Sequence, residues 1–120
     1  MSRIDVNILK QIGNDVGMDM YDSLIEIFIS DSSERLESLK SQFENNDLAK
    51  LKITAHTLKS VCAQYGAMGC SAIAKDLEKM CVDHPSDNET IGKTVAQLSD
   101  ELNEAMKEIK EIKEIKEIKI

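Results

Sequence analysis

Residues 55–67 read AHTLKSVCAQYGA, and this stretch carries the main signal for the fold. Most of its residues are compatible with a helix, and Gly66 is a good helix stop because glycine readily adopts left-handed backbone angles. On a helical wheel at about 100° per residue, His56 points away from an arc of mostly apolar residues. This arc predicts the core face of a helix over residues 48–65, and it consists of Leu51, Thr54, Leu58, Val61 and Tyr65, with Cys62 at its edge.

Helical patterns extend to both sides of this stretch, and strand signals are nearly absent. Further helices are expected over residues 4–13, 19–44, 69–82 and from about residue 90 to the end. Gly13 is expected to close the first helix, with GNDVGMD as the connection, and Asn46 or Asp47 to cap the helix that carries His56. These lengths and short connections predict an all-α fold: an antiparallel four-helix bundle with a short extra N-terminal helix as a lid and an extended C-terminal helix.

The C-terminal residues 108–119 are EIK repeated four times. A period of three does not match the 3.6 residues of a helical turn, so no single face stays apolar. This pattern favours a solvated, fraying extension, because a helix seam needs a heptad period. An oligomerisation or partner helix stays open as the alternative. We therefore expect residues 1–106 to form the bundle, residues 107–120 to form an EIK-repeat helical tail, and the chain to be a monomer.

The composition excludes several classes of function. A net charge of −7 on 120 residues argues against nonspecific nucleic-acid binding and against an anionic membrane surface as partner. No stretch approaches the ~20 apolar residues that span a bilayer. Three cysteines, an odd number, and no signal-peptide pattern indicate free thiols in a reducing compartment, so the expected location is cytoplasmic.

His56 lies on the polar side of its predicted helix, which argues against a buried core histidine. Its neighbours on the wheel are short or cationic side chains, namely Ala49, Lys52, Lys59, Ser60 and Ala63. The short side chains leave the imidazole accessible, and the two lysines form a small patch that favours anions. Neutral imidazole is a nucleophile, and nearby cations steady an added phosphoryl group. The pattern therefore indicates a histidine that accepts a phosphoryl group.

Together with Leu77–Glu78 and the upstream segment LIEIFISDSSERLESLKSQFENND, this stretch resembles the histidine-containing phosphotransfer (HPt) domain. The family pattern is roughly a-H-x-L-K-G followed, about six residues on, by G-A. It is matched here by Ala55, His56, Leu58, Lys59, Gly66 and Ala67. Ser60 stands where the family usually has glycine. The resemblance covers about residues 4–105.

The resemblance implies a phosphorelay carrier in two-component signal transduction, with a phosphohistidine intermediate. His56 would accept the phosphoryl group from a receiver-domain aspartyl phosphate and pass it to another receiver, and Lys59 would neutralise its charge. Receiver docking would involve Lys52, Ile53, Ser60, Ala63 and Gln64. The implied partners are response-regulator receiver domains and a hybrid sensor kinase. The chain would be a phosphoprotein rather than an enzyme: it has no Gly-rich phosphate loop and needs no cofactor of its own, while Mg²⁺ is expected on the receiver.

Three other interpretations have weaker support. Cys81 and His84 are spaced C-x-x-H, but no second pair completes a zinc site, and Cys62 and Cys70 fit small core residues. A Cys/His hydrolase would need a third orienting group and a cleft, and no pattern supplies them. A non-catalytic helical scaffold bundle without phosphate chemistry remains the main alternative function.

Overall fold

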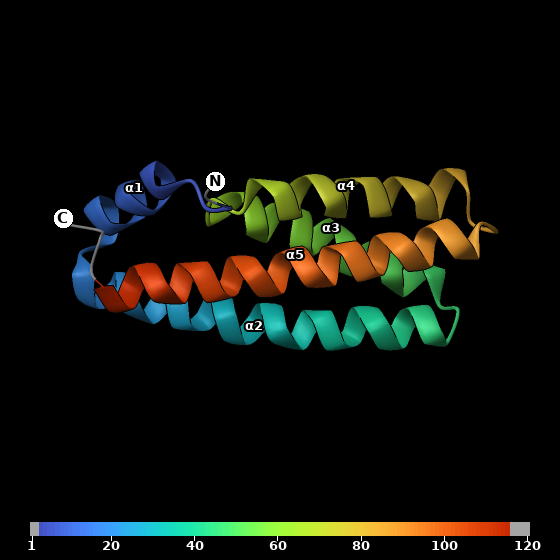
Figure 1. The fold of residues 1–120 in the computed structure, drawn as a ribbon, viewed down its shortest axis with the longest axis horizontal. Coiled ribbons are helices and arrows are strands. Elements are labelled where there is room, and N and C mark those ends of the chain that lie inside the picture. The colour runs from blue at the N-terminus through green and yellow to red at the C-terminus, as the bar shows by residue number, and fades with distance from the viewer. Residues whose placement is uncertain (1–2, 116–120) are drawn as a thin grey trace.

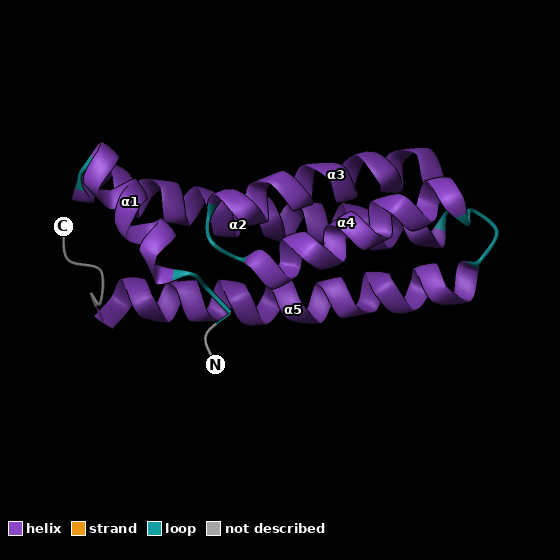
Figure 2. Ribbon diagram, turned by 90° about the horizontal axis from the view of Figure 1, so that it is seen from above, coloured by secondary structure: helices purple, strands orange, loops and turns teal. Residues whose placement is uncertain are grey.

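The computed structural model describes the backbone of residues 3–115 and the side chains of residues 3–112, and its regular elements are all helices (Figure 1). The helices are α1 (Val6–Val16), α2 (Met18–Glu44), α3 (Leu48–Gln64), α4 (Met68–Asp83) and α5 (Asn88–Ile115). Helix α2 packs against α3 and α5, and α4 packs against the same two helices, so α2 and α4 are diagonal in the bundle (Figure 2). Helix α1 packs against α2 at one end. The predicted all-α bundle is confirmed.

The first helix differs from its prediction. Helix α1 continues through Gly13, which is buried, and ends at Val16, so GNDVGMD is not a loop. The connection to α2 is the single residue Gly17, whose φ of 85° is readily accessible to glycine. A glycine inside a helix costs about 1 kcal/mol relative to alanine. Here the packing of the α1 face that carries Leu9 and Gly13 outweighs that cost.

Both ends of α3 lie where the sequence places them. The Asp47 side chain caps the N-terminus by accepting a hydrogen bond from the Lys50 N–H at 3.2 Å. After Gln64 the chain turns at Gly66, which has a φ of 82°, and the Ala67 N–H donates to the Cys62 carbonyl at 2.8 Å. This tight turn returns the chain antiparallel to α3 as α4.

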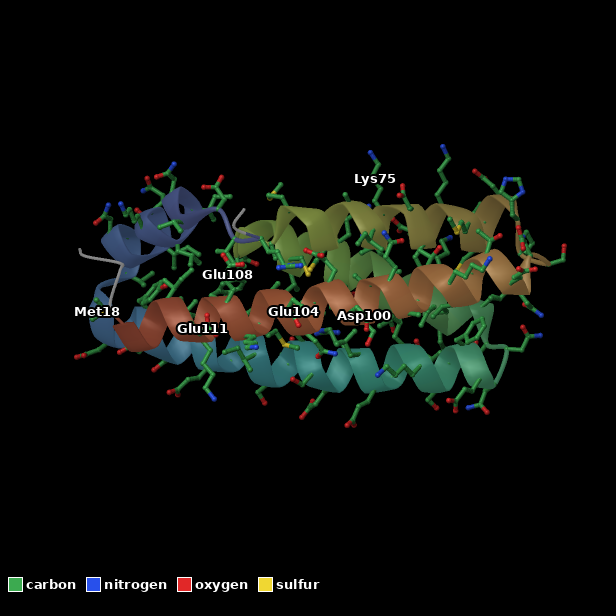
Figure 3. The ribbon with its side chains drawn as sticks, in the orientation of Figure 1. Met18, Lys75, Asp100, Glu104, Glu108 and Glu111 are labelled. Atoms are coloured by element: carbon green, nitrogen blue, oxygen red, sulfur yellow. The ribbon has the colours of Figure 1, made fainter. Side chains whose placement is uncertain are left out.

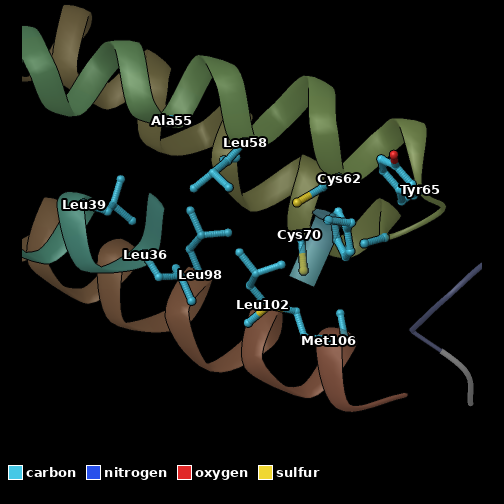
Figure 4. Close-up of a cluster of buried hydrophobic side chains, with 14 of the residues drawn as sticks. Leu36, Leu39, Ala55, Leu58, Cys62, Tyr65, Cys70, Leu98, Leu102 and Met106 are labelled. Carbon is cyan, nitrogen blue, oxygen red and sulfur yellow. The ribbon is translucent and has the colours of Figure 1, made fainter. Parts of the chain in front are cut away.

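The predicted core face of α3 is confirmed. Leu51 and Leu58 are fully buried, and so is Cys62, which was expected only at the edge of the arc, whereas Val61 is half-buried. The close-up in Figure 4 shows Leu58 and Cys62 directed into the space between α3, α4 and α5. The Tyr65 ring stacks on Phe28 of α2, with ring centroids 4.7 Å apart. The core therefore fixes the rotation of α3 about its axis, and with it the direction of His56.

The expectation that the EIK repeats are solvated is wrong for Ile109 and Ile112, which are both buried. The buried face of α5 advances in alternating steps of four and three residues, through Leu98, Leu102, Ala105, Ile109 and Ile112. One three-residue step of the EIK pattern, from Ile109 to Ile112, fits this face despite the ~60° drift per step. Helix α5 thus runs uninterrupted through the expected boundary at residue 106. The side chains of Ile115 and Ile118 lie outside the described residues.

Ser32 lies on the inner side of α2, where its side chain is fully buried and its hydroxyl has no hydrogen-bond partner among the described residues. A buried, unpaired hydroxyl costs about 1–3 kcal/mol. We expect Ser32→Ala to raise the free energy of unfolding by about 1 kcal/mol in urea denaturation. Ser33→Ala is the control: its residue is exposed, and its hydroxyl donates to the Ile29 carbonyl at 2.9 Å. A loss of stability in Ser32→Ala would show that the hydroxyl has a partner.

Candidate functional site

His56 projects from the outer side of α3, and 60% of its side chain is exposed. Its direction follows from its neighbours: Ala55 and Leu58 are completely buried, so the opposite side of this helical turn, which carries His56, faces outward. The wheel prediction of an accessible imidazole is therefore confirmed. Both ends of α3 are held by hydrogen bonds and its inner face is buried, so the backbone that carries the imidazole is held in place.

Glu78 of α4 links the two predicted functional residues. One of its carboxylate oxygens, Oε2, lies 2.6 Å from His56 Nδ1, and the other, Oε1, accepts a hydrogen bond from Lys59 Nζ at 2.8 Å. Two side chains of α3 are thus held by a single carboxylate of the neighbouring helix. The three groups form a His–Glu–Lys cluster on the outer surface between α3 and α4.

Close packing of α3 against α4 allows Glu78 to reach across. Several buried side chains of the two helices are small, namely Ala55, Cys62, Cys70 and Ala74. A side-chain hydrogen bond also joins the helices, because the Ser71 hydroxyl donates to the Lys59 carbonyl at 2.8 Å. Small residues let the backbones approach, so the glutamate side chain is long enough to meet both partners.

The charge of Glu78 is favoured by its surroundings. The hydrogen bond from Lys59 holds the pKa of the Glu78 carboxyl below its usual 4.5, and His56 acts in the same direction, while partial burial opposes them. The carboxylate is therefore ionised at neutral pH. Its contribution to stability is present above pH 4.5 and is lost as the pH falls through the lowered pKa.

An ionised carboxylate only accepts hydrogen bonds, so the contact with Glu78 places a proton on His56 Nδ1. In the neutral ring the lone pair then resides on Nε2, on the other side of the imidazole. With most of the side chain in solvent, Nε2 is open to a reactant. The arrangement suits a nucleophilic histidine whose tautomer is fixed by a carboxylate.

The remaining predicted site residues surround His56 on α3. Lys52, Ser60 and Gln64 are exposed, Ala63 is half-buried, and Ile53 is an exposed apolar side chain at 65%. Lys52 lies on the side of α4: burial raises the pKa of the Cys81 thiol, and the Lys52 charge opposes that rise. These residues form one continuous strip along the outer surface of α3.

The predicted patch of two cations beside the imidazole needs a correction. The Lys59 ammonium is paired with Glu78, so a negative charge lies inside the patch. Over residues 48–83, five lysines still outnumber three acidic residues, whereas the rest of the chain is strongly acidic. Figure 3 shows Lys75 on the outer side of α4, with Asp100, Glu104 and Glu108 along α5. The cluster therefore lies on two helices that together are less acidic than the rest of the chain.

All three cysteines are buried free thiols, as expected for the core residues Cys62 and Cys70. The hydrogen bond with Cys62, together with burial, raises the pKa of the Cys70 thiol. Among the described residues, no group of three or more His, Cys, Asp and Glu side chains is placed to hold a metal ion. In the same part of the chain, no helix is both long and apolar enough to cross a membrane.

Comparison with known proteins gives one family and one structural relative. The family described as "Hpt domain" matches residues 23–112. The chain is also similar to the crystal structure of histidine-containing phosphotransfer protein B (HptB) from Pseudomonas aeruginosa PAO1, with 24% identity and a TM-score of 0.82. That match covers 93% of this chain and 95% of the other. No curated protein matches the chain.

Proposed function

The chain belongs to the Hpt domain family, and from this premise we propose that it carries a phosphoryl group on His56 between receiver domains of a two-component phosphorelay. The observation that supports this most directly is the exposed imidazole whose Nδ1 is engaged by Glu78. That contact leaves Nε2 as the nucleophile. Location of the chain in the cytoplasm is part of the same proposal.

In the proposed reaction, the Nε2 lone pair attacks the phosphorus of a receiver aspartyl phosphate. The bond between phosphorus and the aspartate oxygen breaks, and the carboxylate leaves with the electron pair. The ring gains positive charge and keeps its proton on Nδ1, where the Glu78 carboxylate stabilises it. Phosphoryl transfer depends mainly on positioning and on charge stabilisation, which this cluster supplies. The reverse steps deliver the group to a second receiver.

Lys59 has a separate part in this proposal. It lies one turn beyond His56 and is held by Glu78 at 2.8 Å before the reaction. A phosphoryl group on Nε2 brings about two negative charges, which offer the ammonium a second partner. Lys59 then neutralises the phosphoryl oxygens. Receiver docking is assigned to the strip around His56, which comprises Lys52, Ile53, Ser60, Ala63 and Gln64.

The chain is proposed to act as a phosphocarrier and not as a kinase. Its sequence has no Gly-rich phosphate loop, so the phosphoryl group comes from a hybrid sensor kinase through a receiver. The receiver supplies the acidic cluster and the Mg²⁺. Ser60, in place of the usual glycine, donates from its hydroxyl to the His56 carbonyl at 3.5 Å and leaves the ring exposed. The substitution is therefore compatible with docking.

The proposal is tested by incubating the purified chain with a panel of phosphorylated receivers. We expect rapid transfer of label from at least one receiver, and the label should be labile in acid and stable in alkali. Phosphorus NMR should show a phosphoramidate resonance coupled to Nε2. An acid-stable label would indicate a hydroxyl ester instead. Absence of transfer from every receiver would favour the non-catalytic scaffold bundle.

Removal of the Glu78 carboxylate should release the ring tautomer. In Glu78→Ala, nothing holds the proton on Nδ1, and we expect transfer from the receiver to slow by roughly tenfold, as for other orienting partners of histidine. Ring ¹⁵N chemical shifts should show the Nε2–H tautomer growing at the expense of Nδ1–H. Glu78→Gln keeps an acceptor oxygen and should retain most of the tautomer bias. Unchanged ¹⁵N shifts in Glu78→Ala would show that the carboxylate does not set the tautomer.

A further inference from the structure

The outer face of α2 presents a second surface, separate from the His–Glu–Lys cluster. Ile27 is 59% exposed and Met20 is 54% exposed, and seven residues separate them, so they lie on the same side of the helix. A shallow groove surrounds Ile27 and is lined by Ser23, Glu26, Ile27, Ser30, Asp31 and Glu34. Among the described residues, the lining comes from α2 alone.

The spacing on this face is that of a helix-packing seam. Met20 and Ile27 are seven residues apart, and each is followed by a serine three residues later, Ser23 and Ser30. In a coiled coil, such positions form holes that receive side chains of a second helix. The small serine side chains leave the holes beside Ile27 open. A straight helix fits this face better than a loop, because the groove follows the axis of α2.

The charges around the groove define the partner. Over Met18–Glu44, seven acidic residues face two basic ones, Arg35 and Lys40. Glu26 and Glu34 flank the groove, and Asp31 is paired with Arg35 at 3.1 Å. A second copy of the same face would set acidic residues against acidic residues, and an anionic membrane would be repelled as well. A helix with lysine or arginine beside its apolar residues is complementary.

We propose that the outer face of α2, centred on Ile27, docks a basic amphipathic helix of a partner protein. The partner places an aliphatic side chain between Ser23 and Ser30 and a cation beside Glu34. The His–Glu–Lys cluster lies on the side of α3 that meets α4, and α4 is diagonal to α2, so a helix on the outer face of α2 approaches from the other side of α3. The docked helix tethers the chain without blocking His56.

The test uses a synthetic three-heptad helix with leucine at the core positions and lysine at the flanking positions, and an otherwise identical peptide with glutamate as the flanking residue. Binding to the unphosphorylated full chain is followed by fluorescence anisotropy and by amide chemical shifts. We expect the lysine peptide to bind, to shift amides of residues 20–34, and to weaken as salt screens the charges. The glutamate peptide should not bind. Shifts centred on α3 and α4, or on α5, would overturn the proposal.

Ile27→Ser should weaken binding of the lysine peptide by about tenfold, because the central apolar contact is lost. Val82→Ser is the matched control, since Val82 is an equally exposed aliphatic residue, at 56%, near the end of α4. It should bind like the unmodified chain. Equal affinities for all three proteins would mean that the peptide binds through charge alone, and the α2 site would be rejected. Because binding is measured without phosphate, its outcome is independent of the proposed relay.

Discussion

His56→Gln is expected to abolish uptake of label from a phosphorylated receiver, down to the background of the assay. Glutamine has no nitrogen lone pair of comparable nucleophilicity, so no phosphoramidate forms. The fold should survive, because 60% of the His56 side chain is exposed and none of the core contacts of α3 depend on it. The glutamine amide can also donate a hydrogen bond to Glu78, so the substitution leaves the carboxylate paired.

His84→Gln is the matched control for this experiment. His84 is the other histidine of the chain and is exposed at the C-terminal end of α4. This variant should accept label at the rate of the unmodified chain. Circular dichroism and urea denaturation should show equal folding of both variants. Label retained by His56→Gln and lost by His84→Gln would identify His84, at the C-terminal end of α4, as the acceptor and would refute the proposed site.

The sequence predicts α3 and the direction of His56 well because both depend on local rules. A 3.6-residue period defines one buried side, and Gly66 and Asp47 provide ends that need no tertiary context. Gly13 shows the limit of such rules. Glycine is a frequent helix stop, but its fate depends on whether packing against another helix compensates for its low helix propensity. That contribution is not visible in the local sequence.

Glu78 was missed as a site residue for a related reason. It lies 22 residues after His56, and only the distance between α3 and α4 decides that its carboxylate meets both His56 and Lys59. The feature of the sequence that could have identified Glu78 is the pair Leu77–Glu78. In a helix antiparallel to α3, a buried Leu77 places Glu78 at the edge of the contact between α3 and α4. The distance of approach itself depends on the small residues between the helices.

The prediction that the EIK segment is solvated is wrong for a different reason, because it depends on the period that a long helix seam requires. A seam of many turns needs a heptad repeat, and the repeat does not supply one. Among the described side chains, the core takes only two positions beyond Met106, and Ile109 and Ile112 meet that shorter requirement. Whether a repeat is solvated thus depends on how far the neighbouring helices extend, which composition and period leave undetermined.

Gly66→Ala is expected to lower the free energy of unfolding by about 3 kcal/mol. The φ of 82° costs a side-chain-bearing residue about 1–2 kcal/mol. The new Cβ would also lie 2.8 Å from the Asp5 carbonyl oxygen and 3.3 Å from the Asp5 nitrogen. These are backbone atoms, so the N-terminal segment must move away. That movement breaks the hydrogen bond from the Asp5 N–H to the Gly66 carbonyl, 2.9 Å long, which contributes about 1 kcal/mol.

Gly17→Ala separates the two contributions to this loss. Gly17 has nearly the same φ, 85°, but a Cβ built there meets nothing within 4 Å. With a ψ of 162°, Gly17 lies in a backbone region that is almost restricted to glycine, so its variant should lose only a conformational part of about 1–3 kcal/mol in the same urea denaturation series. A larger loss in Gly66→Ala than in Gly17→Ala then indicates the contact of the N-terminal segment with the α3–α4 turn. If both variants lose equal stability, this contact does not hold the turn, and the α3–α4 hairpin that aligns His56 with Glu78 is stable without the N-terminal segment.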